Sequence, residues 1–274
     1  MIYTDEELYM HHKTTIHPEE SQFFLHTHTQ NEIFCLLRGT GYYTVEGYDY
    51  PLSPGCIMIM REGETHTPHI SPDGPYERIA LHFTTGFVAP VYREFLLSSF
   101  FDRPLGHRNY IAPSPRLEKI QNMLLHMVHE PLPEQERRIR IRLYIPTLLY
   151  EIANAIQDGG GYSAPTVEGK SLVSRIIDYI NEAPQCIENM DMLAEHFGYS
   201  YSYINQTFRH SMGISIWDYV ILKRLNMARS LIRGGTPAVT AAEEAGFADY
   251  SSFYRQFKKR FGTTPSDEKK AGSL

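Results

Sequence analysis

The last third of the chain has the hydrophobic spacing of two short helix pairs. In the first pair, Asn189 is placed to cap one helix, Gly198 to end it, and Ser200 to cap the next. Ile204 and Phe208 lie four residues apart on that second helix, so they share the face that we expect to be buried. A short helix, a turn with glycine and a second helix form the helix-turn-helix pattern.

The second pair repeats this pattern. Thr236 precedes Pro237, which predicts a cap followed by a proline at the first helical position. Gly246 is expected to end that helix and Asp249 to cap the next one. The inward-facing residues of the last helix are predicted to be Phe253 and Phe257.

A longer helix, about residues 215–233, joins the two pairs. Ser215 and Asp218 form a capping box at its start, and Gly234-Gly235 stops it. Its apolar positions predict one buried face: Val220, Leu225, Ala228, Leu231 and Ile232.

From about residue 23 to residue 83 the pattern changes to that of short strands. Runs of aromatic and branched residues alternate with turns that contain Gly, Pro, Asp or Asn. Many short strands with regular turns predict a small barrel or jelly roll. The predicted strands are 32–37, 41–45, 56–60 and 78–83.

After residue 83 the apolar spacing becomes helical. It predicts a short helix over 91–100 and longer helices over 115–130 and 134–157, the last kinked or interrupted by Pro146. Such a stripe is most often core, packed here on the strands. Its members in the last helix are Ile139, Leu143, Leu149, Ile152, Ala153 and Ile156.

These patterns predict an α+β chain with two domains. Residues 1–158 form a β-barrel or jelly roll with packed helices, 159–168 a Gly-rich flexible linker, and 169–268 an all-α domain with two helix-turn-helix units, opened by a helix over 172–182.

Charge separates the two parts of the chain. Residues 1–168 hold 13 Lys or Arg and 21 Asp or Glu, a net charge of −8, and residues 169–274 hold 13 and 11, a net charge of +2. The acidic total of −6 argues against nonspecific coating of nucleic acid, while the basic C-terminal part allows directed phosphate contacts.

The chain has no apolar run long enough to cross a membrane and no basic, apolar leader at its start, which predicts a cytoplasmic protein. Cys35, Cys56 and Cys186 have no metal or redox spacing, so we expect reduced thiols.

One group of residues in the strand region has the composition of a metal site. His26 and His28 are two apart, so on a strand they project to the same face. Glu32 and His66 are expected to meet them from neighbouring strands inside the barrel. Three imidazoles and one carboxylate are suitable ligands for a divalent metal. By contrast, His11, His12 and His17 are interpreted as a solvated or pocket-covering N-terminal arm, and His126 and His129 as helix surface.

The spacing of this group resembles the two cupin motifs. Gly39 follows in the first motif, and Gly55 and Gly63 precede the last histidine in the second. Arg61 departs from the motif, which usually has proline at that position.

The helical pattern of the last hundred or so residues resembles the DNA-binding domain of the AraC/XylS family of bacterial transcription regulators. Large aliphatic residues are usual in that family where Ala238 and Ala241 stand, and Tyr-Arg where Asp267-Glu268 stand. The resemblance rests on Tyr219, Arg224, Leu225, Ala228, Ala242, Gly246, Phe247, Ser252, Phe253, Arg255, Phe257, Lys258 and the run Gly262-Thr-Thr-Pro265.

The resemblance implies that the second helix of each pair enters a major groove. Amides suit adenine, the fork of an arginine suits guanine, and other cations suit phosphates. The predicted outward set of the first unit is Ser202, Asn205 and Gln206, that of the second is Ser251, Tyr254 and Arg255, and the phosphate contacts are Arg209, Lys258 and Lys259.

In sensor domains of this family a cupin-like pocket usually holds a small organic effector, often without metal. Two interpretations of His26, His28, Glu32 and His66 therefore stay open: they line an effector pocket, a sugar being one candidate, or they bind a divalent metal. The resemblance also implies a homodimer through residues 115–157, with RNA polymerase as a further candidate partner.

Two functions fit these observations. The first is an effector-controlled transcription regulator that binds double-stranded DNA. The second is a metal-dependent cupin enzyme, an isomerase or dioxygenase, with a helical appendage. The two helix-turn-helix units favour the regulator, because catalysis does not require them, and the chain is predicted not to be an enzyme.

Overall fold

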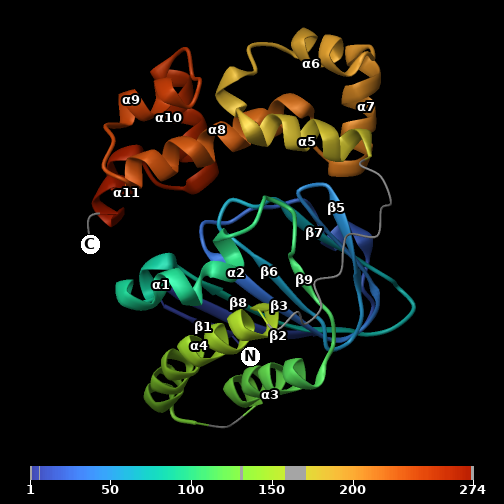
Figure 1. The fold of residues 1–274 in the computed structure, drawn as a ribbon, viewed down its shortest axis with the longest axis vertical. Coiled ribbons are helices and arrows are strands. Elements are labelled where there is room, and N and C mark those ends of the chain that lie inside the picture. The colour runs from blue at the N-terminus through green and yellow to red at the C-terminus, as the bar shows by residue number, and fades with distance from the viewer. Residues whose placement is uncertain (1, 6, 130–131, 158–170, 273–274) are drawn as a thin grey trace. The chain divides into compact units, whose positions relative to one another are not determined.

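The computed structural model describes residues 2–5, 7–129, 132–157 and 171–272 (Figure 1). The chain divides into two compact units, Met1–Glu168 and Gly169–Leu274. In the described residues the first unit contains strands followed by helices and the second contains helices, which confirms the predicted class. The linker predicted over 159–168 lies outside the described residues.

Antiparallel strands of the first unit form two sheets that share a core (Figure 1). The larger sheet has the order β1-β2-β8-β3-β6-β9, and the smaller one the order β5-β4-β7. The larger sheet consists of β1 (Ile2–Thr4), β2 (Leu8–Thr15), β3 (Asn31–Arg38), β6 (Ile57–Met60), β8 (Tyr76–Phe83) and β9 (Tyr110–Ile111), and the smaller of β4 (Gly41–Val45), β5 (Tyr48–Leu52) and β7 (His66–Ile70).

Alternation along the strands gives the larger sheet two different faces. Ile33 and Leu81 point to one face and pack with the helices that cover it. Phe34 and Met58 point to the other face and pack with residues of the smaller sheet. The β-rich core expected for a cupin-like domain is thus confirmed as two facing sheets.

The four predicted strands are all present, but the sequence pattern did not predict β1, β2, β5, β7 or β9. In β2 only Leu8 and Met10 are fully buried, and the remaining positions are tyrosine, histidine, lysine and threonine. Such a strand has little hydrophobic signal, because its second face lines a cavity and not the core.

Helices α1–α4 of the first unit agree with the predicted spans, except that the first is divided at Leu97, which ends α1 and begins α2. Pro146 lies within α4 without interrupting it. The bounds are α1 (Pro90–Leu96), α2 (Ser98–Phe101), α3 (Pro115–His129) and α4 (Glu134–Gln157), and the 3₁₀ turns are η1 (Glu20–Gln22) and η2 (Thr85–Phe87).

The apolar stripe predicted for α4 is wrong at two positions. Ile139 and Leu143 are 53% and 68% exposed, whereas Ile141 and Ile145 are fully buried. A shift of two residues turns a side chain by about 200° around a helix, so the core face and this exposed face are nearly opposite. Leu149, Ile152 and Ala153 are buried as predicted.

The second unit follows its predicted caps closely. The side chains of Asn189, Ser200, Ser215 and Asp249 each accept a backbone N–H at the start of a helix. The helices are α5 (Leu172–Glu182), η3 (Pro184–Cys186), α6 (Met190–Phe197), α7 (Tyr201–Met212), α8 (Ile216–Arg233), α9 (Ala238–Glu244), α10 (Tyr250–Phe261) and α11 (Pro265–Gly272).

One cap is wrong: the residue before α9 is Pro237, not Thr236, and it makes no side-chain hydrogen bond. The departure from the family at the last helix has a structural counterpart. Glu268 is 4% exposed and accepts hydrogen bonds from Arg229 and Arg233, both at 2.6 Å, so this acidic residue fastens α11 to α8.

Buried Arg224 holds the two helix pairs of the second unit together. Its Nε donates to the carbonyl oxygen of Pro184 at 2.9 Å, and its two terminal nitrogens donate to those of Gly246 and Ile187, both at 2.7 Å. The arginine therefore connects the segment before the first helix pair with the turn of the second.

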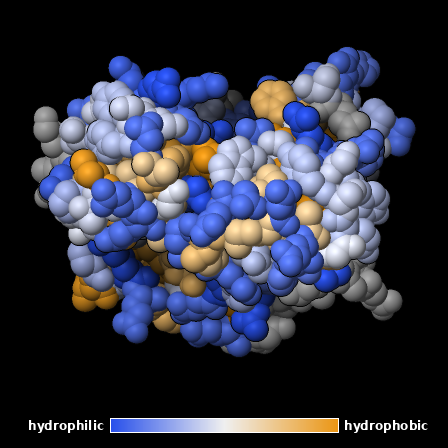
Figure 2. Space-filling model, turned by 90° about the horizontal axis from the view of Figure 1, so that it is seen from above, coloured by the Kyte–Doolittle hydropathy of each residue, from blue (hydrophilic) through white to orange (hydrophobic). Residues whose placement is uncertain are grey.

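No helix among the described residues is long and apolar enough to cross a membrane. On the face of the molecule in Figure 2, hydrophilic residues predominate and smaller hydrophobic areas lie between them.

Candidate effector and DNA-binding sites

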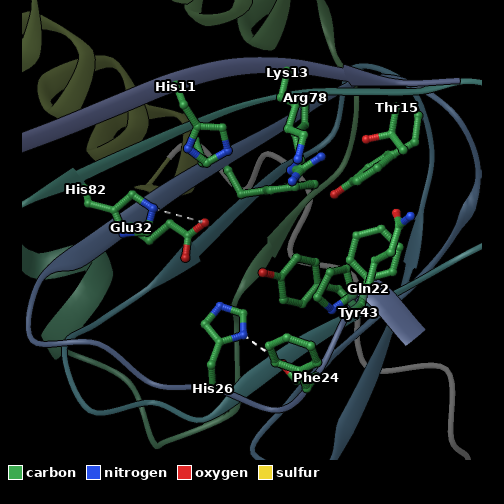
Figure 3. Close-up of a pocket in the computed structure, with 15 residues that line it drawn as sticks. His11, Lys13, Thr15, Gln22, Phe24, His26, Glu32, Tyr43, Arg78 and His82 are labelled. Atoms are coloured by element: carbon green, nitrogen blue, oxygen red, sulfur yellow. Dashed lines mark hydrogen bonds and ion pairs between the residues drawn. The ribbon is translucent and has the colours of Figure 1, made fainter. Parts of the chain in front are cut away.

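A cavity of about 490 Å³ lies between the two sheets of the first unit (Figure 3). Strand alternation determines its lining: every second residue of β2 and of β8 points into it, opposite side chains from β4 and β7. The lining residues are His11, Lys13, Thr15, Gln22, Phe23, Phe24, His26, Glu32, Phe34, Tyr43, Pro68, Tyr76, Arg78, Ala80 and His82.

Four imidazoles surround the carboxylate of Glu32 at one end of this region. Its Oε2 lies 2.8 Å from Nε2 of His28 and 3.2 Å from Nε2 of His66, and its Oε1 lies 3.9 Å from Nε2 of His82. His26 joins the group through backbone hydrogen bonds with His66 in both directions.

Two triads of this cluster share the same glutamate. The ligand atoms of His26, Glu32 and His66 all lie within 4.8 Å of one another, and so do those of His28, Glu32 and His82. The structure thus brings the four residues expected from the sequence together, but it divides them between two triads and adds His82.

The path by which His26 and His28 reach the cluster differs from the prediction. Neither residue belongs to a strand of either sheet: His26 forms an isolated bridge with His66, and His28 lies in the following loop. The two-residue alternation argument is therefore wrong. Only His26 and Glu32 of the four line the cavity, while His28 and His66 contact its histidine end.

The cluster is strongly coupled electrostatically. Burial alone would raise the pKa of Glu32, but the imidazoles of His82, His28 and His66 hold that pKa well below its ordinary value. Burial lowers the pKa of His82 to about 3. Burial also acts to lower the pKa of His66, but its contact with Glu32 and the negative charge of that residue raise it overall. The carboxylate is thus ionised among imidazoles that can serve as ligands or hydrogen-bond partners.

The residues fit a divalent metal by their chemistry. Nε2 of His66 is buried and has no hydrogen bond of good geometry, although Glu32 lies 3.2 Å away. An ion held at about 2.1 Å by both groups would satisfy that nitrogen. The same unpaired nitrogen would equally suit a hydroxyl group of an organic effector.

The N-terminal histidines do not form an arm. His11 and His12 lie in β2, which pairs with β8 along its whole length, and only exposed His17 falls outside a strand. His11 lines the cavity, whereas His12 faces the opposite side, where its Nε2 lies 2.7 Å from Oε1 of Glu77. The predictions for His126 and His129 are confirmed, since both are exposed on α3.

On α7, the second helix of the first pair, the predicted outward residues behave differently from one another. Ser202, Gln206 and Arg209 are exposed. Asn205 is half-buried, and its Oδ1 accepts a hydrogen bond from the backbone N–H of Ile216 at 3.1 Å. Asn205 therefore does not project outward, because it satisfies a free N–H at the start of α8.

The corresponding face of α10 is more basic. Ser251, Arg255, Lys258 and Lys259 are exposed, and Tyr254 is half-buried. Phe253 and Phe257 are fully buried beneath them, as predicted. The first helix pair has exposed tyrosines around the start of α7: Tyr199, Tyr201 and Tyr203.

Comparison with known protein families assigns a domain to each part of the chain. A model of the AraC-like ligand binding domain matches residues 14–152, and a model of a helix-turn-helix domain matches residues 193–271. The first match alone covers half of the chain and includes the whole cavity lining except His11 and Lys13.

The chain belongs to the AraC family of transcription regulators. It is 24% identical over 251 residues to the thermoregulatory protein LcrF of Yersinia pestis, a match that covers 87% of this chain and 89% of that protein. It is 32% identical over 95 residues to the transcriptional regulatory protein HptR of Staphylococcus aureus, covering 35% and 38% of the two chains.

Among solved structures, ToxT of Vibrio cholerae bound to an unsaturated fatty acid aligns over 97% of this chain and 96% of its own, with 11% identity and a TM-score of 0.38. As a member of the AraC family, this chain is a transcription regulator with a ligand-binding N-terminal domain and a helix-turn-helix DNA-binding domain.

Of the cavity lining, the sequence pattern of this AraC-family regulator predicted only His26 and Glu32. A signal for some of the others existed in the predicted strand over 78–83, where Ile79, Leu81 and Phe83 alternate with Arg78 and His82. That alternation places the two polar residues on one face, opposite the hydrophobic core. The residues of β2 had no comparable signal, because its strand was not predicted.

Proposed function

We propose that this regulator binds a small-molecule effector in the cavity between its two sheets, and that occupancy of the cavity changes its affinity for DNA. The observation that carries the proposal is the cavity, lined by polar and aromatic side chains within a domain of the ligand-binding type. A cavity of this volume suits a small organic molecule. An effector alters DNA binding only if it favours one state of the protein over another.

For DNA, we assign base contacts to the exposed residues of the two recognition helices. Gln206 and Ser202 make these contacts in the first helix pair, and Arg255, Ser251 and Tyr254 make them in the second. An arginine fork can bind guanine specifically, whereas phosphate contacts position the protein without reading the sequence. The proposed phosphate contacts are Arg209, Lys258 and Lys259.

For the histidine cluster, a divalent metal is part of the proposal. The triad of His26, Glu32 and His66 would hold the ion, and His28 and His82 would support or complete its ligand set. The ion would supply a positive centre for an oxygen of the effector. Metal analysis of the purified protein, compared with a Glu32→Gln variant, tests this part.

For assembly, we propose a homodimer through α4. The exposed residues Ile139, Leu143 and Tyr150 are four and seven positions apart, so they share one face of this helix, and Tyr150 continues the face onto Phe95 of α1. A Leu143→Glu variant should sediment as a monomer at a concentration where the unchanged chain is dimeric. Equal sedimentation of both would contradict this interface.

We also propose that the protein acts in the cytoplasm on chromosomal DNA, contacts RNA polymerase there and has no catalytic activity. The relatives named above are regulators, which supports this reading over the cupin enzyme. The histidine cluster is the one feature that favours the enzyme, and turnover of a small substrate by the metal-loaded protein would support it.

The experiment that tests the proposal begins with selection of duplexes from a random library by the full chain. Fluorescence anisotropy then gives the affinity for a selected duplex and for a scrambled one. We expect a large preference for the selected duplex, lost in an Arg255→Ala, Gln206→Ala double variant. Equal affinities for the two duplexes would contradict sequence-specific binding.

A further inference from the structure

Arg78 occupies an unusual position in the larger sheet. It lies on β8 between β2 and β3, and its direct neighbours on the two strands are Lys13 and Leu36. Like charges directly opposite each other on adjacent strands destabilise a sheet. Two cations therefore stand side by side with no acid between them, and both line the cavity (Figure 3).

The polar atoms around Arg78 are buried without partners. Its Nη1 and the hydroxyl of Tyr76 are each buried without a hydrogen bond, as is Nδ1 of His11. In the described part of the chain, no residue forms an ion pair with Arg78. Leaving a buried polar group unpaired is costly, so such groups are rare unless a ligand or water satisfies them.

These donors converge on a small region of the cavity. The guanidinium carbon of Arg78 lies 4.5 Å from the centre of the Tyr76 ring, so the hydroxyl and the guanidinium belong to one group. In Figure 3 the side chains of Arg78 and Lys13 descend together into the cavity, away from His26 on the far side.

The two ends of the cavity differ in charge. Glu32 supplies a negative charge at the histidine end, where imidazoles surround it. The end near Arg78 has two cations and a hydroxyl donor and no acidic residue among the lining. Arg78 and Lys13 therefore offer an anion two cations with no acid beside them.

We propose that the effector is a carboxylic acid whose carboxylate is held by Arg78 and Tyr76, with Lys13 at the cavity mouth. The proposal rests on the effector function of the cavity proposed above. A carboxylate matches the fork of a guanidinium with two parallel hydrogen bonds, and it supplies the missing acceptor for the tyrosine hydroxyl.

The rest of the lining indicates the body of this acid. Phe23, Phe24, Phe34 and Tyr43 give the cavity an aromatic wall, and Pro68 adds to it. Such a wall suits an apolar, flat or ring-shaped body. A single carboxylate also leaves the cavity less negative than a phosphate group would, next to the ionised Glu32.

Thermal unfolding of the full chain with matched acids and neutral analogues tests this proposal. The probes are benzoate with benzamide, phenylacetate with phenylacetamide, hexanoate with hexanamide, and galacturonate with galactose, at equal ionic strength, with inorganic phosphate as a further anion. We expect at least one acid to raise the unfolding temperature further as its concentration increases, and its neutral analogue to leave it unchanged.

Variants then locate the effect. Arg78→Met should weaken the binding of that acid at least tenfold, and Arg78→Lys, which keeps the charge but not the fork, should weaken it less. Arg38→Met is the matched control, since Arg38 is an exposed arginine of the same sheet outside the cavity lining, and it should bind like the unchanged chain.

Three outcomes would refute the proposal that the effector is a carboxylic acid. They are stabilisation by a neutral analogue that equals its acid, stabilisation by phosphate alone, and full retention of acid binding by Arg78→Met. The first outcome would leave the effector function standing with a different ligand class. An acid that binds through Arg78 but never changes DNA affinity would instead confirm the carboxylate and refute the proposed effector function.

Discussion

The two units of this regulator contain arginines with opposite hydrogen bonding: buried Arg224 and half-buried Arg78. In the DNA-binding unit, Arg224 is 6% exposed and donates to three carbonyl oxygens at 2.9 Å or less. In the sensor unit, Arg78 has a buried nitrogen without a partner and a lysine as its cross-strand neighbour. Arg224 stabilises the fold through these hydrogen bonds. Arg78 has a buried N–H that no protein group accepts, so it can donate to a ligand.

The difference shows where buried polar groups indicate a ligand site. The residues proposed to bind DNA, such as Arg255 and Lys258, are exposed to solvent, so the absence of a protein partner says little about their role. An atom buried in a cavity wall meets less solvent, so an unpaired donor there is a stronger indication of a ligand.

The sharpest test of this comparison replaces each of the two arginines by methionine. Arg224→Met removes the hydrogen bonds of the guanidinium to the carbonyl oxygens of Pro184, Gly246 and Ile187 and should lower the free energy of unfolding of the second unit by about 3 kcal/mol. Arg78→Met removes an unpaired group and should change the stability of the ligand-free protein by less than about 1 kcal/mol.

Urea unfolding measures both effects. Trp217 is the single tryptophan of the chain and lies in the second unit, so its fluorescence follows that unit, while far-UV circular dichroism follows the whole chain. If Arg78→Met were as destabilising as Arg224→Met, Arg78 would be an ordinary structural residue and the comparison would fail.

A smaller effect is expected on the DNA side. Arg255→Ala should weaken specific binding by about 1–3 kcal/mol and relax the preference at one base pair, because a fork to guanine is lost. Lys258→Ala should weaken binding to all duplexes and reduce the salt dependence by about one charge. Binding curves on matched and single-mismatch duplexes distinguish the two, and identical curves for Arg255→Ala and the unchanged chain would refute the base contact.

Asn205 distinguishes a structural role from recognition on the same helix. Because its Oδ1 accepts the N–H of Ile216, Asn205→Ala should cost about 1 kcal/mol of stability, as the loss of a helix cap does. The Asn205→Ala variant should keep the base preference of the unchanged chain in anisotropy titrations with single-mismatch duplexes, whereas Gln206→Ala should change it. A changed preference for Asn205→Ala would restore it as a base-reading residue.

The last prediction concerns the dependence of stability on pH. Burial, together with the charge of Arg78, lowers the pKa of His11 to about 4, from an ordinary value of 6.5. Between these values the unfolded chain binds a proton that the folded chain does not, so stability is full above pH 6.5 and falls as the pH decreases towards 4.

A His11→Gln variant should reduce this decrease in the unfolding temperature between pH 7 and pH 4.5. Glu77→Gln, on the opposite face of the same sheet, serves as the control for a change near β2. The same decrease in His11→Gln as in the unchanged chain would show that other groups account for it.

The DNA-binding unit could be predicted from the sequence because its signals are local. Asn189, Ser200, Ser215 and Asp249 cap their helices through residues two or three positions away, and each lies where the pattern predicted. The failure at Thr236 is also local, since the backbone of α9 begins one residue later.

The sensor site depends on contacts between distant parts of the chain, and there the predictions were weaker. His82 lies 50 positions after Glu32 in the sequence but opposite it in the sheet, which only the register of β3 and β8 determines. His26 reaches the cluster through one bridge to His66, a pairing that no period in the sequence encodes. Composition suggested the cluster, but strand alternation gave the wrong reason for it.

The central claim is that an acid bound at Arg78 controls DNA binding. The most direct measurement is an anisotropy titration of the selected duplex with the full chain, with and without the acid that raises the unfolding temperature most. The account predicts that the acid changes the dissociation constant at least fivefold for the unchanged chain and for Arg38→Met, and leaves it unchanged for Arg78→Met. Superimposable titrations of the unchanged chain with and without the acid would contradict it.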